Sequence, residues 1–235
     1  MSQVLIDVLR KVPLFDGLHQ EELEALTEAV VRRVFPRNSI IIFAEDRGET
    51  FFIIHRGRVK ISLMSEEGRE VILSILEDGE FFGDLSLLDG KPRSADVTAI
   101  EDTELCVLRR PDFLRLIHTV PQIAVEILGV LASRLRRADR MIASLTFLDI
   151  TGRIADVLLH IADERGIERE EGVCIPDRPS YQTLASMVGT TRETVTRVIG
   201  RLQTQGYLSV EGQEITLLRK KLLNGWNYRR SDELD

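Results

Sequence analysis

The sequence predicts an α+β fold in which a small β-barrel is followed by a long helix and a winged helix-turn-helix. Between Val34 and Leu108, short runs of β-branched and aromatic residues alternate with glycine or acidic turns, as in a barrel of many short strands. From Pro121 to Phe147 there is no further proline, and apolar residues recur at helical spacing. Residues 180–217 show the pattern of helix, glycine turn, helix and hairpin. At 235 residues, the chain is long enough for two domains.

The composition indicates a protein of the reducing cytoplasm. Nowhere do about 18 apolar residues follow one another, so we expect neither a membrane span nor export. The two cysteines, Cys106 and Cys174, are far apart in the sequence, which disfavours a disulfide framework and a cysteine cluster for zinc or iron–sulfur. The net charge of −7 argues against a surface coated with nucleic-acid-binding charge, although it permits a short local basic face.

The first third of the chain predicts one short helix and then hairpins. Leu23, Leu26, Val30 and Val34 recur at helical spacing, so we expect an amphipathic helix over His19–Arg33. Five glycines then recur at a spacing near eleven and predict hairpin turns with a left-handed backbone. They are Gly48, Gly57, Gly68, Gly79 and Gly90.

The long helix carries an apolar stripe close to a coiled-coil seam, which favours a homodimer. The stripe consists of Ile123, Ile127, Val130/Leu131, Ala138, Met141/Ile142 and Leu145. The alternative is a helix packed on its own domain. Asp149 can cap a following helix that ends at Gly166, which makes Leu148-Asp149 a hinge. We therefore expect a sensor domain over 1–120, a dimerisation helix and hinge over 121–148, and a DNA-binding domain over 149–235.

The helix-turn-helix outline runs through Ser180–Gly189 and Thr190–Leu202, with Thr190 and Glu193 as a possible capping box. In the second helix we expect Val195, Ile199 and Leu202 to form the buried face. The other face is polar and lies where such helices approach base edges in the major groove. An arginine can contact guanine O6 and N7 together, and a glutamate can accept from cytosine N4. The candidate DNA-binding residues are Thr191, Arg192, Glu193, Thr196, Arg197 and Arg201. The alternative is a solvated face with an Arg192–Thr196 or Glu193–Arg197 helix pair.

A second candidate site lies in Phe81–Ala95, where a glycine precedes an acid and an arginine–serine pair follows a turn. Backbone amides and the fork of Arg93 can receive one phosphate, and Asp84 can accept a hydrogen bond from a sugar hydroxyl. From the residues alone, an Asp84–Arg93 ion pair remains an equal alternative.

Two runs, Leu145–Ala155 and Val188–Arg197, resemble the hinge and recognition helix of the CRP/FNR family of bacterial transcription regulators. The resemblance covers nearly the whole chain. It implies that Arg192, Glu193 and Arg197 read a TGTGA-type half-site, and that two subunits bind a palindrome. Thr191 and Thr196 differ from the best-known pattern of the family.

The Phe81–Ala95 run resembles the phosphate-binding cassette of cyclic-nucleotide-binding domains, which implies a β-roll (double-stranded jelly roll). The implied ligand-binding residues are Gly83, Asp84, Leu85, Ser86, Arg93, Ser94, Ala95, Arg134, Ala138 and Asp139. Cyclic-nucleotide binders usually have glutamate at the position of Asp84, and the family has hydroxyl residues where this helix has Ala138 and Asp139. Asp139 can accept from the adenine amino group or from guanine N1–H and N2–H. Cyclic AMP is the first candidate, with cyclic GMP or a cyclic dinucleotide as alternatives.

The resulting expectation is a non-enzymatic, allosteric transcription regulator whose partners are palindromic DNA, a second copy and, for an activator, RNA polymerase. No nucleophile–base set or Walker-type loop points to an enzyme. Scattered histidines and the absence of an N-terminal cysteine cluster disfavour haem and iron–sulfur. Two alternatives stay open: a cyclic-nucleotide-gated module that acts on a protein partner, and a ligand-independent regulator. Trp226 and the tail 219–235 have no assigned chemistry.

Overall fold

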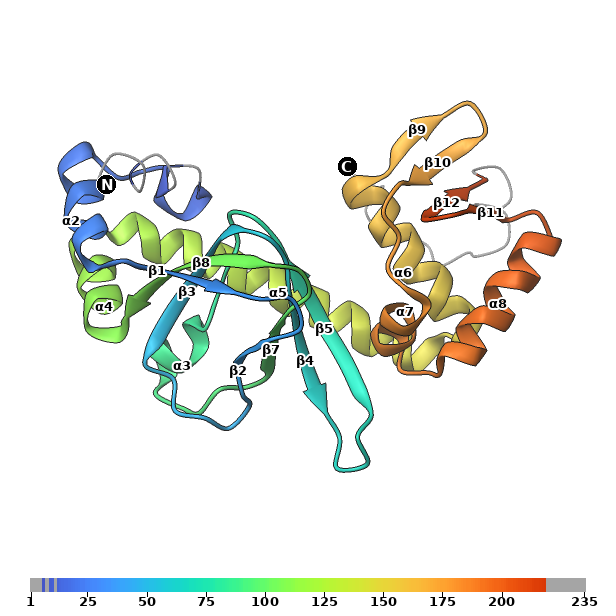
Figure 1. Cartoon of the computed structure of the whole chain (residues 1–235), viewed down its shortest axis with the longest axis horizontal. Coiled ribbons are helices and arrows are strands. Elements are labelled where there is room, and N and C mark those ends of the chain that lie inside the picture. Colours follow the sequence, from blue (N-terminus) through green and yellow to red (C-terminus); the bar gives the residue numbers. More distant parts are fainter. Residues whose placement is uncertain (1–5, 7–8, 11, 219–235) are drawn as a thin grey trace. The chain divides into compact units, whose positions relative to one another are not determined.

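The computed structural model describes residues 6, 9–10 and 12–218, so Trp226 and the tail 219–235 lie outside the described residues (Figure 1). The backbone divides into two compact units, residues 1–138 and 139–235, and each is described by itself.

The first unit is a roll of two four-stranded antiparallel sheets with short helices (Figure 1). One sheet has the order β1-β8-β3-β6 and the other β2-β7-β4-β5. The strands are β1 (Val31–Phe35), β2 (Ile40–Ile42), β3 (Thr50–Arg56), β4 (Val59–Met64), β5 (Glu70–Leu76), β6 (Phe81–Phe82), β7 (Asp96–Ala99) and β8 (Thr103–Arg109). The helices are η1 (Pro13–Phe15), α2 (Gln20–Ala29), α3 (Asp84–Asp89) and α4 (Arg110–Thr119), followed by α5 (Pro121–Phe147). The predicted β-roll is confirmed.

Alternate residues of β3 face two separate cores, because successive side chains of a strand point to opposite sides. Phe51 lies in the core that includes the helices, where its ring centroid is 4.6 Å from that of Phe113 of α4. Phe52 lies in the core between the sheets, stacked at 4.9 Å on Phe82. Phe81 and Phe82 likewise divide between the two cores. The start of the Phe81–Ala95 run is thereby packed into both cores.

Two expectations for this unit were only partly correct. The N-terminal helix is α2, and the expected helix His19–Arg33 is wrong beyond Ala29, since Val31–Phe35 pairs with β8 as β1. Gly57, Gly68, Gly79 and Gly90 have positive φ as predicted, whereas Gly48 has none. A Cβ on Gly48 would lie 2.3 Å from Cβ of Ser86, so close packing against the cassette requires glycine there.

The long helix is confirmed as α5, but the predicted apolar stripe is divided between buried and exposed residues. Ile123 and Ile127 are 2% exposed and belong to the core of the roll, so this side of the helix packs on its own domain. Ile142 and Leu145 of the predicted stripe are exposed (62% and 47%), and so are three apolar residues that the stripe did not include, Val125, Leu128 and Leu135 (57%, 63% and 64%). The periodicity predicted the helix correctly but could not separate its two apolar faces.

The second unit combines three helices with a four-stranded antiparallel sheet of order β11-β12-β10-β9 (Figure 1). Its elements are α6 (Ile150–Arg165), β9 (Ile167–Arg169), β10 (Gly172–Ile175), α7 (Tyr181–Val188), α8 (Arg192–Thr204), β11 (Leu208–Glu211) and β12 (Glu214–Leu217). Asp149 caps α6, as predicted, by accepting from the backbone N–H of Gly152 at 2.7 Å. The predicted winged helix-turn-helix is confirmed.

Within the described residues, no single helix is long and apolar enough to cross a membrane. The pair α4 and α5, bent by 109°, reaches that length and apolarity only when both helices are taken together. Phe113 and Leu116 of α4, with Ile123 and Ile127 of α5, are buried in the core of the roll.

Candidate functional site

The turn between α7 and α8 is fixed by local capping. The Ser180 hydroxyl accepts from the backbone N–H of Thr183 at 3.0 Å and starts α7. Gly189 follows in the left-handed region (φ 69°, ψ 47°), which glycine adopts without strain. The cap of α8 is Thr191, whose hydroxyl accepts from Thr194 N–H at 3.3 Å. The predicted capping box at Thr190 is therefore wrong by one residue.

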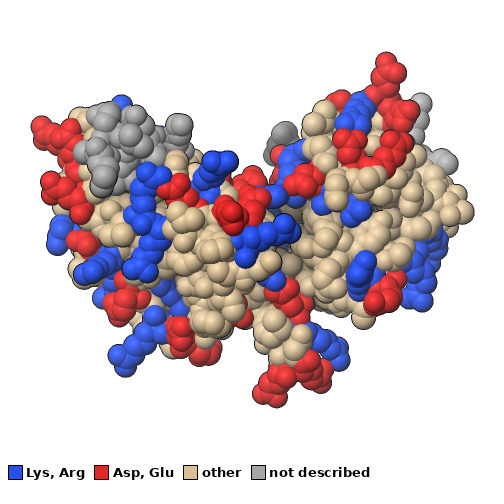
Figure 2. All heavy atoms as spheres, viewed as in Figure 1, with Lys and Arg blue, Asp and Glu red and all other residues tan. Residues whose placement is uncertain are grey.

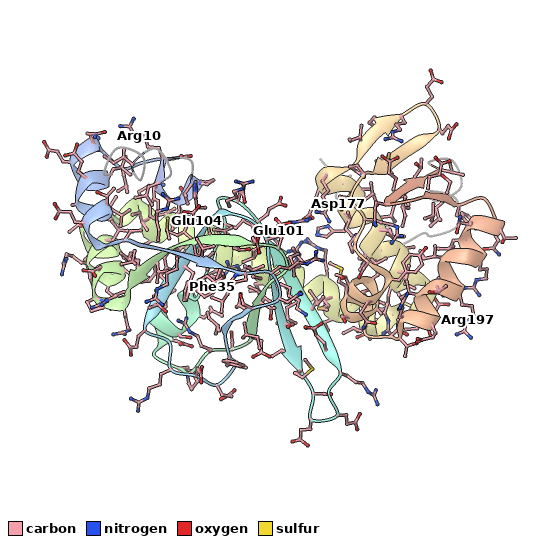
Figure 3. All side chains as sticks on the ribbon, in the orientation of Figure 1. Arg10, Phe35, Glu101, Glu104, Asp177 and Arg197 are labelled. Carbon is pink, nitrogen blue, oxygen red and sulfur yellow. The ribbon has the colours of Figure 1, made fainter. Side chains whose placement is uncertain are left out.

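Helix α8 has one buried and one exposed face. Val195, Val198, Ile199 and Leu202 are buried in the core of the second unit. All six predicted DNA-binding residues are exposed, namely Thr191, Arg192, Glu193, Thr196, Arg197 and Arg201. Figure 2 shows basic spheres with a small acidic group over this helix, and in Figure 3 Arg197 extends away from the ribbon. The polar face is thus presented to solvent on a helix whose other side is held by packing.

The exposed face carries two arginines, Arg192 and Arg197, beside one acid, Glu193. Arg192, Glu193, Thr196 and Arg197 line a hollow of about 410 Å³. Within the described part of the chain, neither Arg192 nor Arg197 has a carboxylate partner, so the Glu193–Arg197 pair considered from spacing is not formed. Hydrogen bonds to the carboxyl of Glu193 from its own backbone N–H and the Thr191 side chain lower its pKa. Glu193 is therefore an ionised acceptor at neutral pH.

Arg201 differs from the other five because it has a partner within its own unit. Its guanidinium donates to the Thr151 hydroxyl in the first turn of α6. This bond connects the last turns of α8 to the start of α6. If Arg201 also contacts DNA, its guanidinium must either keep the hydrogen bond to Thr151 and use its other N–H groups, or break that bond.

Two arginines that hold this unit together were not found by sequence reasoning. Arg153 of α6 donates to the backbone carbonyl oxygens of Val188 (3.4 Å) and Leu148 (3.2 Å). Arg178 donates to the carbonyl of Gly212 in the wing turn at 3.2 Å and lies 4.6 Å over the ring of Tyr181. Two of these acceptors, Val188 and Gly212, are 35 and 34 positions from their arginines, so no local residue pattern indicates these contacts.

In the roll, the cassette is built around a buried arginine. Arg93 is 5% exposed. One of its terminal nitrogens donates to the carbonyl of Gly83 at 2.8 Å, and the other donates to the carbonyl and hydroxyl oxygens of Thr50 at 2.7 and 3.1 Å. Burial lowers the pKa of Arg93, and Asp84, Glu49 and Asp46 partly oppose that shift. The guanidinium remains charged at neutral pH because an arginine normally titrates far above it.

Gly83 lets the backbone approach this arginine closely. Its φ is 81°, and a Cβ there would lie 2.8 Å from a terminal nitrogen of Arg93 and 2.9 Å from the carbonyl oxygen of Thr50. Any other residue would combine backbone strain with a collision. The glycine and the arginine of the predicted cassette are thus brought together, and Thr50 joins them as a partner that the sequence pattern did not reveal.

Asp84 pairs with Arg134 of α5 and not with Arg93, so the Asp84–Arg93 ion pair is wrong. One terminal nitrogen of Arg134 lies 2.9 and 3.1 Å from the two carboxylate oxygens of Asp84. The other donates to the carbonyl of Phe81, and the guanidinium lies 5.1 Å over the ring of that residue. The Asp84 side chain is 2% exposed, so α5 is connected to the cassette through a buried carboxylate.

The other predicted ligand-binding residues differ in burial. Ser86 and Ala95 are buried, whereas Leu85, Ser94, Ala138 and Asp139 are exposed. The structure gives Asp139 no hydrogen bond or ion pair with another described residue. Among the described residues, no group of three or more His, Cys, Asp or Glu side chains is arranged to hold a metal ion.

A β-roll with a buried arginine and a winged helix-turn-helix define a class of DNA-binding regulators with a sensor domain. Residues 32–120 match the cyclic nucleotide-binding domain family, and residues 152–226 match the Crp-like helix-turn-helix domain family. The chain belongs to the CRP/FNR family of transcription regulators.

Relatives in this family cover nearly the full length of the chain. The cyclic AMP receptor protein of Thermus thermophilus is 35% identical over 213 residues, which are 88% of this chain and 95% of the relative. A CRP-like cAMP-activated global transcriptional regulator of Mycobacterium tuberculosis is 30% identical over 90% of this chain and 94% of its own. The solved structure of the c-di-GMP-responsive global regulator CLP of Xanthomonas campestris has a TM-score of 0.73 and 26% identity, covering 85% of this chain and 99% of that one.

Proposed function

We propose that the protein is a ligand-responsive, sequence-specific transcription regulator that binds DNA as a homodimer. In this proposal, residues 1–120 sense the ligand, 121–148 form the dimerisation helix and hinge, and 149–235 bind DNA. The observation that carries it is the exposed face of α8, on which Arg192 and Arg197 have no carboxylate partner within the described residues. Two arginines that form no salt bridge with a described residue, beside an ionised acid, suit base edges that offer both acceptors and donors.

The reading of DNA is assigned to three side chains. Arg192 and Arg197 can each contact the O6 and N7 acceptors of guanine, and Glu193 can accept from the N4 amine of cytosine. Two copies related by a two-fold axis then recognise a TGTGA-like palindrome. Thr191 and Arg201 are assigned to the margins of this interface, because one caps α8 and the other contacts Thr151.

The effector is assigned to the cassette, with a cyclic nucleotide as ligand. Arg93 places a buried positive charge beside Gly83, and an anionic phosphate is the chemical group that such a charge attracts in a site of low dielectric. Cyclic AMP is the first candidate, supported by the relatives named for it. Cyclic GMP and a cyclic dinucleotide remain candidates, the latter because CLP of Xanthomonas campestris is c-di-GMP-responsive.

Dimerisation is assigned to the exposed apolar residues of α5, namely Val125, Leu128, Leu135 and Ile142. Val125, Leu128 and Leu135 are each more than half exposed, and Leu128, Leu135 and Ile142 recur every seven residues. A coiled-coil seam has apolar residues at two positions of each seven-residue repeat, and Leu128, Leu135 and Ile142 supply one of them. Burying these side chains against a second copy removes this surface from water. Non-enzymatic action, a cytoplasmic location and contact with RNA polymerase in activation belong to the same proposal.

Calorimetric titration of nucleotide-stripped protein with cyclic AMP, cyclic GMP and cyclic di-GMP tests the effector. A mobility-shift titration with a TGTGA palindrome, with and without each nucleotide, tests the output. We expect one nucleotide to bind and to raise affinity for the palindrome over scrambled DNA. Binding of a nucleotide without any palindrome preference would favour a module that acts on a protein partner. Equal palindrome binding in all conditions would favour a ligand-independent regulator.

A further inference from the structure

Thr196 occupies the middle of the exposed face of α8. It lies one helical turn after Arg192 and directly before Arg197, and it lines the hollow that these residues form with Glu193. The side chain is exposed, so nothing in the described part of its own unit covers it. Whatever enters this hollow therefore meets Thr196 as well as the charged groups around it.

The hydroxyl of Thr196 is already used inside the helix. Its Oγ1 donates to the backbone carbonyl of Arg192 at 3.0 Å. A threonine hydroxyl has one proton to donate, so this bond leaves only its lone pairs for a base edge. Lone pairs find no donor on thymine, whose major-groove edge offers the O4 acceptor and the C5-methyl group. The same bond selects the side-chain rotamer in which the hydroxyl faces the preceding turn, and this fixes the position of the γ-methyl group.

The methyl group is the chemical feature that Thr196 adds to the hollow. The other three lining residues end in two guanidinium groups and a carboxylate, and Thr196 supplies the only side-chain methyl among the four. In the major groove, the C5-methyl of thymine is the apolar feature that a threonine methyl contacts, and cytosine lacks it.

We propose that Thr196 is a specificity-determining residue whose γ-methyl group selects a pyrimidine carrying a 5-methyl group within each half-site. This inference rests on the proposed function, because it requires α8 to enter the major groove. Burying one methyl group changes affinity by about fourfold per half-site, or about fifteenfold when both half-sites are changed.

The test uses DNA chosen by the full-length protein itself. A random duplex library is selected with cyclic AMP, with cyclic GMP, with cyclic di-GMP and without nucleotide. Each thymine of the enriched half-site is then replaced symmetrically by deoxyuridine, which removes only the methyl group. Affinities are compared for wild type, Thr196→Ser, which keeps the hydroxyl but lacks the methyl, and Thr196→Val, which keeps a methyl but lacks the hydroxyl. Circular dichroism and non-specific DNA affinity confirm that the variants are folded.

We expect one thymine whose replacement weakens wild type and Thr196→Val about fifteenfold but leaves Thr196→Ser unchanged. The same losses for wild type and Thr196→Ser at every thymine would overturn the role of the methyl group while leaving the proposed function intact. A preference kept by Thr196→Ser and lost by Thr196→Val would assign the reading to the hydroxyl and would also overturn it. If no sequence is enriched in any condition, the proposed function fails, and this inference fails with it.

Discussion

Replacing Arg134 by alanine should destabilise the roll, because it leaves the carboxylate of Asp84 buried without its cation. The Asp84 side chain is 2% exposed and has both oxygens within 3.1 Å of one nitrogen of Arg134. Removing one partner of a buried ion pair costs about 3–5 kcal/mol. Arg134 is 31% exposed, so water partly screens the pair, and Asp84 still interacts electrostatically with Arg93 in the variant. We therefore expect the low end of that range, about 3 kcal/mol.

Asp84→Asn in the Arg134→Ala background removes the unpaired charge and should recover about 1–2 kcal/mol of that loss. Arg136→Ala, on the same helix, is the matched control and should stay within about 0.5 kcal/mol of wild type. Urea unfolding is followed by hydrogen-exchange mass spectrometry on peptides of β3 and β8, at fixed protein concentration, so that the roll is observed separately from the second unit. An Arg134→Ala roll as stable as wild type, or an Asp84→Asn change that brings no recovery, would refute the reasoning.

Three further outcomes are expected from single substitutions. Thr191→Ala should lower the unfolding free energy of the second unit by about 1 kcal/mol through loss of the α8 cap, whereas Thr190→Ala should change it little; equal effects in urea unfolding would argue against the Thr191 cap. Leu135→Glu should shift the protein from dimer to monomer in sedimentation at micromolar concentration, with Arg136→Glu as control, and a dimeric Leu135→Glu variant would exclude the exposed apolar residues of α5 as the interface. Burial raises the pKa of the Cys106 thiol to about 11, whereas an unfolded thiol has a pKa of about 8.5. The neutral thiol therefore stabilises the folded state fully below about pH 8.5. This contribution is lost as the pH rises to about 11. Over that window the unfolding free energy of wild type should fall more steeply than that of Cys106→Ala, and parallel curves would contradict the shift.

The sequence predicted an element best where its apolar residues all lie on one buried face. The hydrophobic face of α8, with Val195 and Ile199 at its centre, and the hairpin β11–β12 were both found because each has one buried side. The stripe on α5 failed for the opposite reason. A helix with Ile127 in its own core and Leu128 exposed has apolar residues on two faces, and spacing alone cannot assign them.

Side-chain partners were harder to predict than elements. The sequence placed Gly83 and Arg93 in one cassette, but it did not predict that Arg93 donates to the carbonyl of Gly83, or that Thr50 is a further acceptor, which depends on how β3 packs beside the cassette. The pairing of Asp84 with Arg134 joins residues fifty positions apart, and several nearby arginines fit equally well by type. Such contacts follow from the packing of whole elements, and local patterns do not contain that information.

The central claim is that α8 reads base edges. It is tested most directly by titrating Arg197→Ala and Glu193→Ala against the bound palindrome and its single-base variants at two salt concentrations. We expect each substitution to relax discrimination by about 1–3 kcal/mol at one symmetric base-pair position. The salt dependence should change less than after loss of a phosphate-contacting cation. Uniform losses across all sequences, with no position relaxed, would contradict the account.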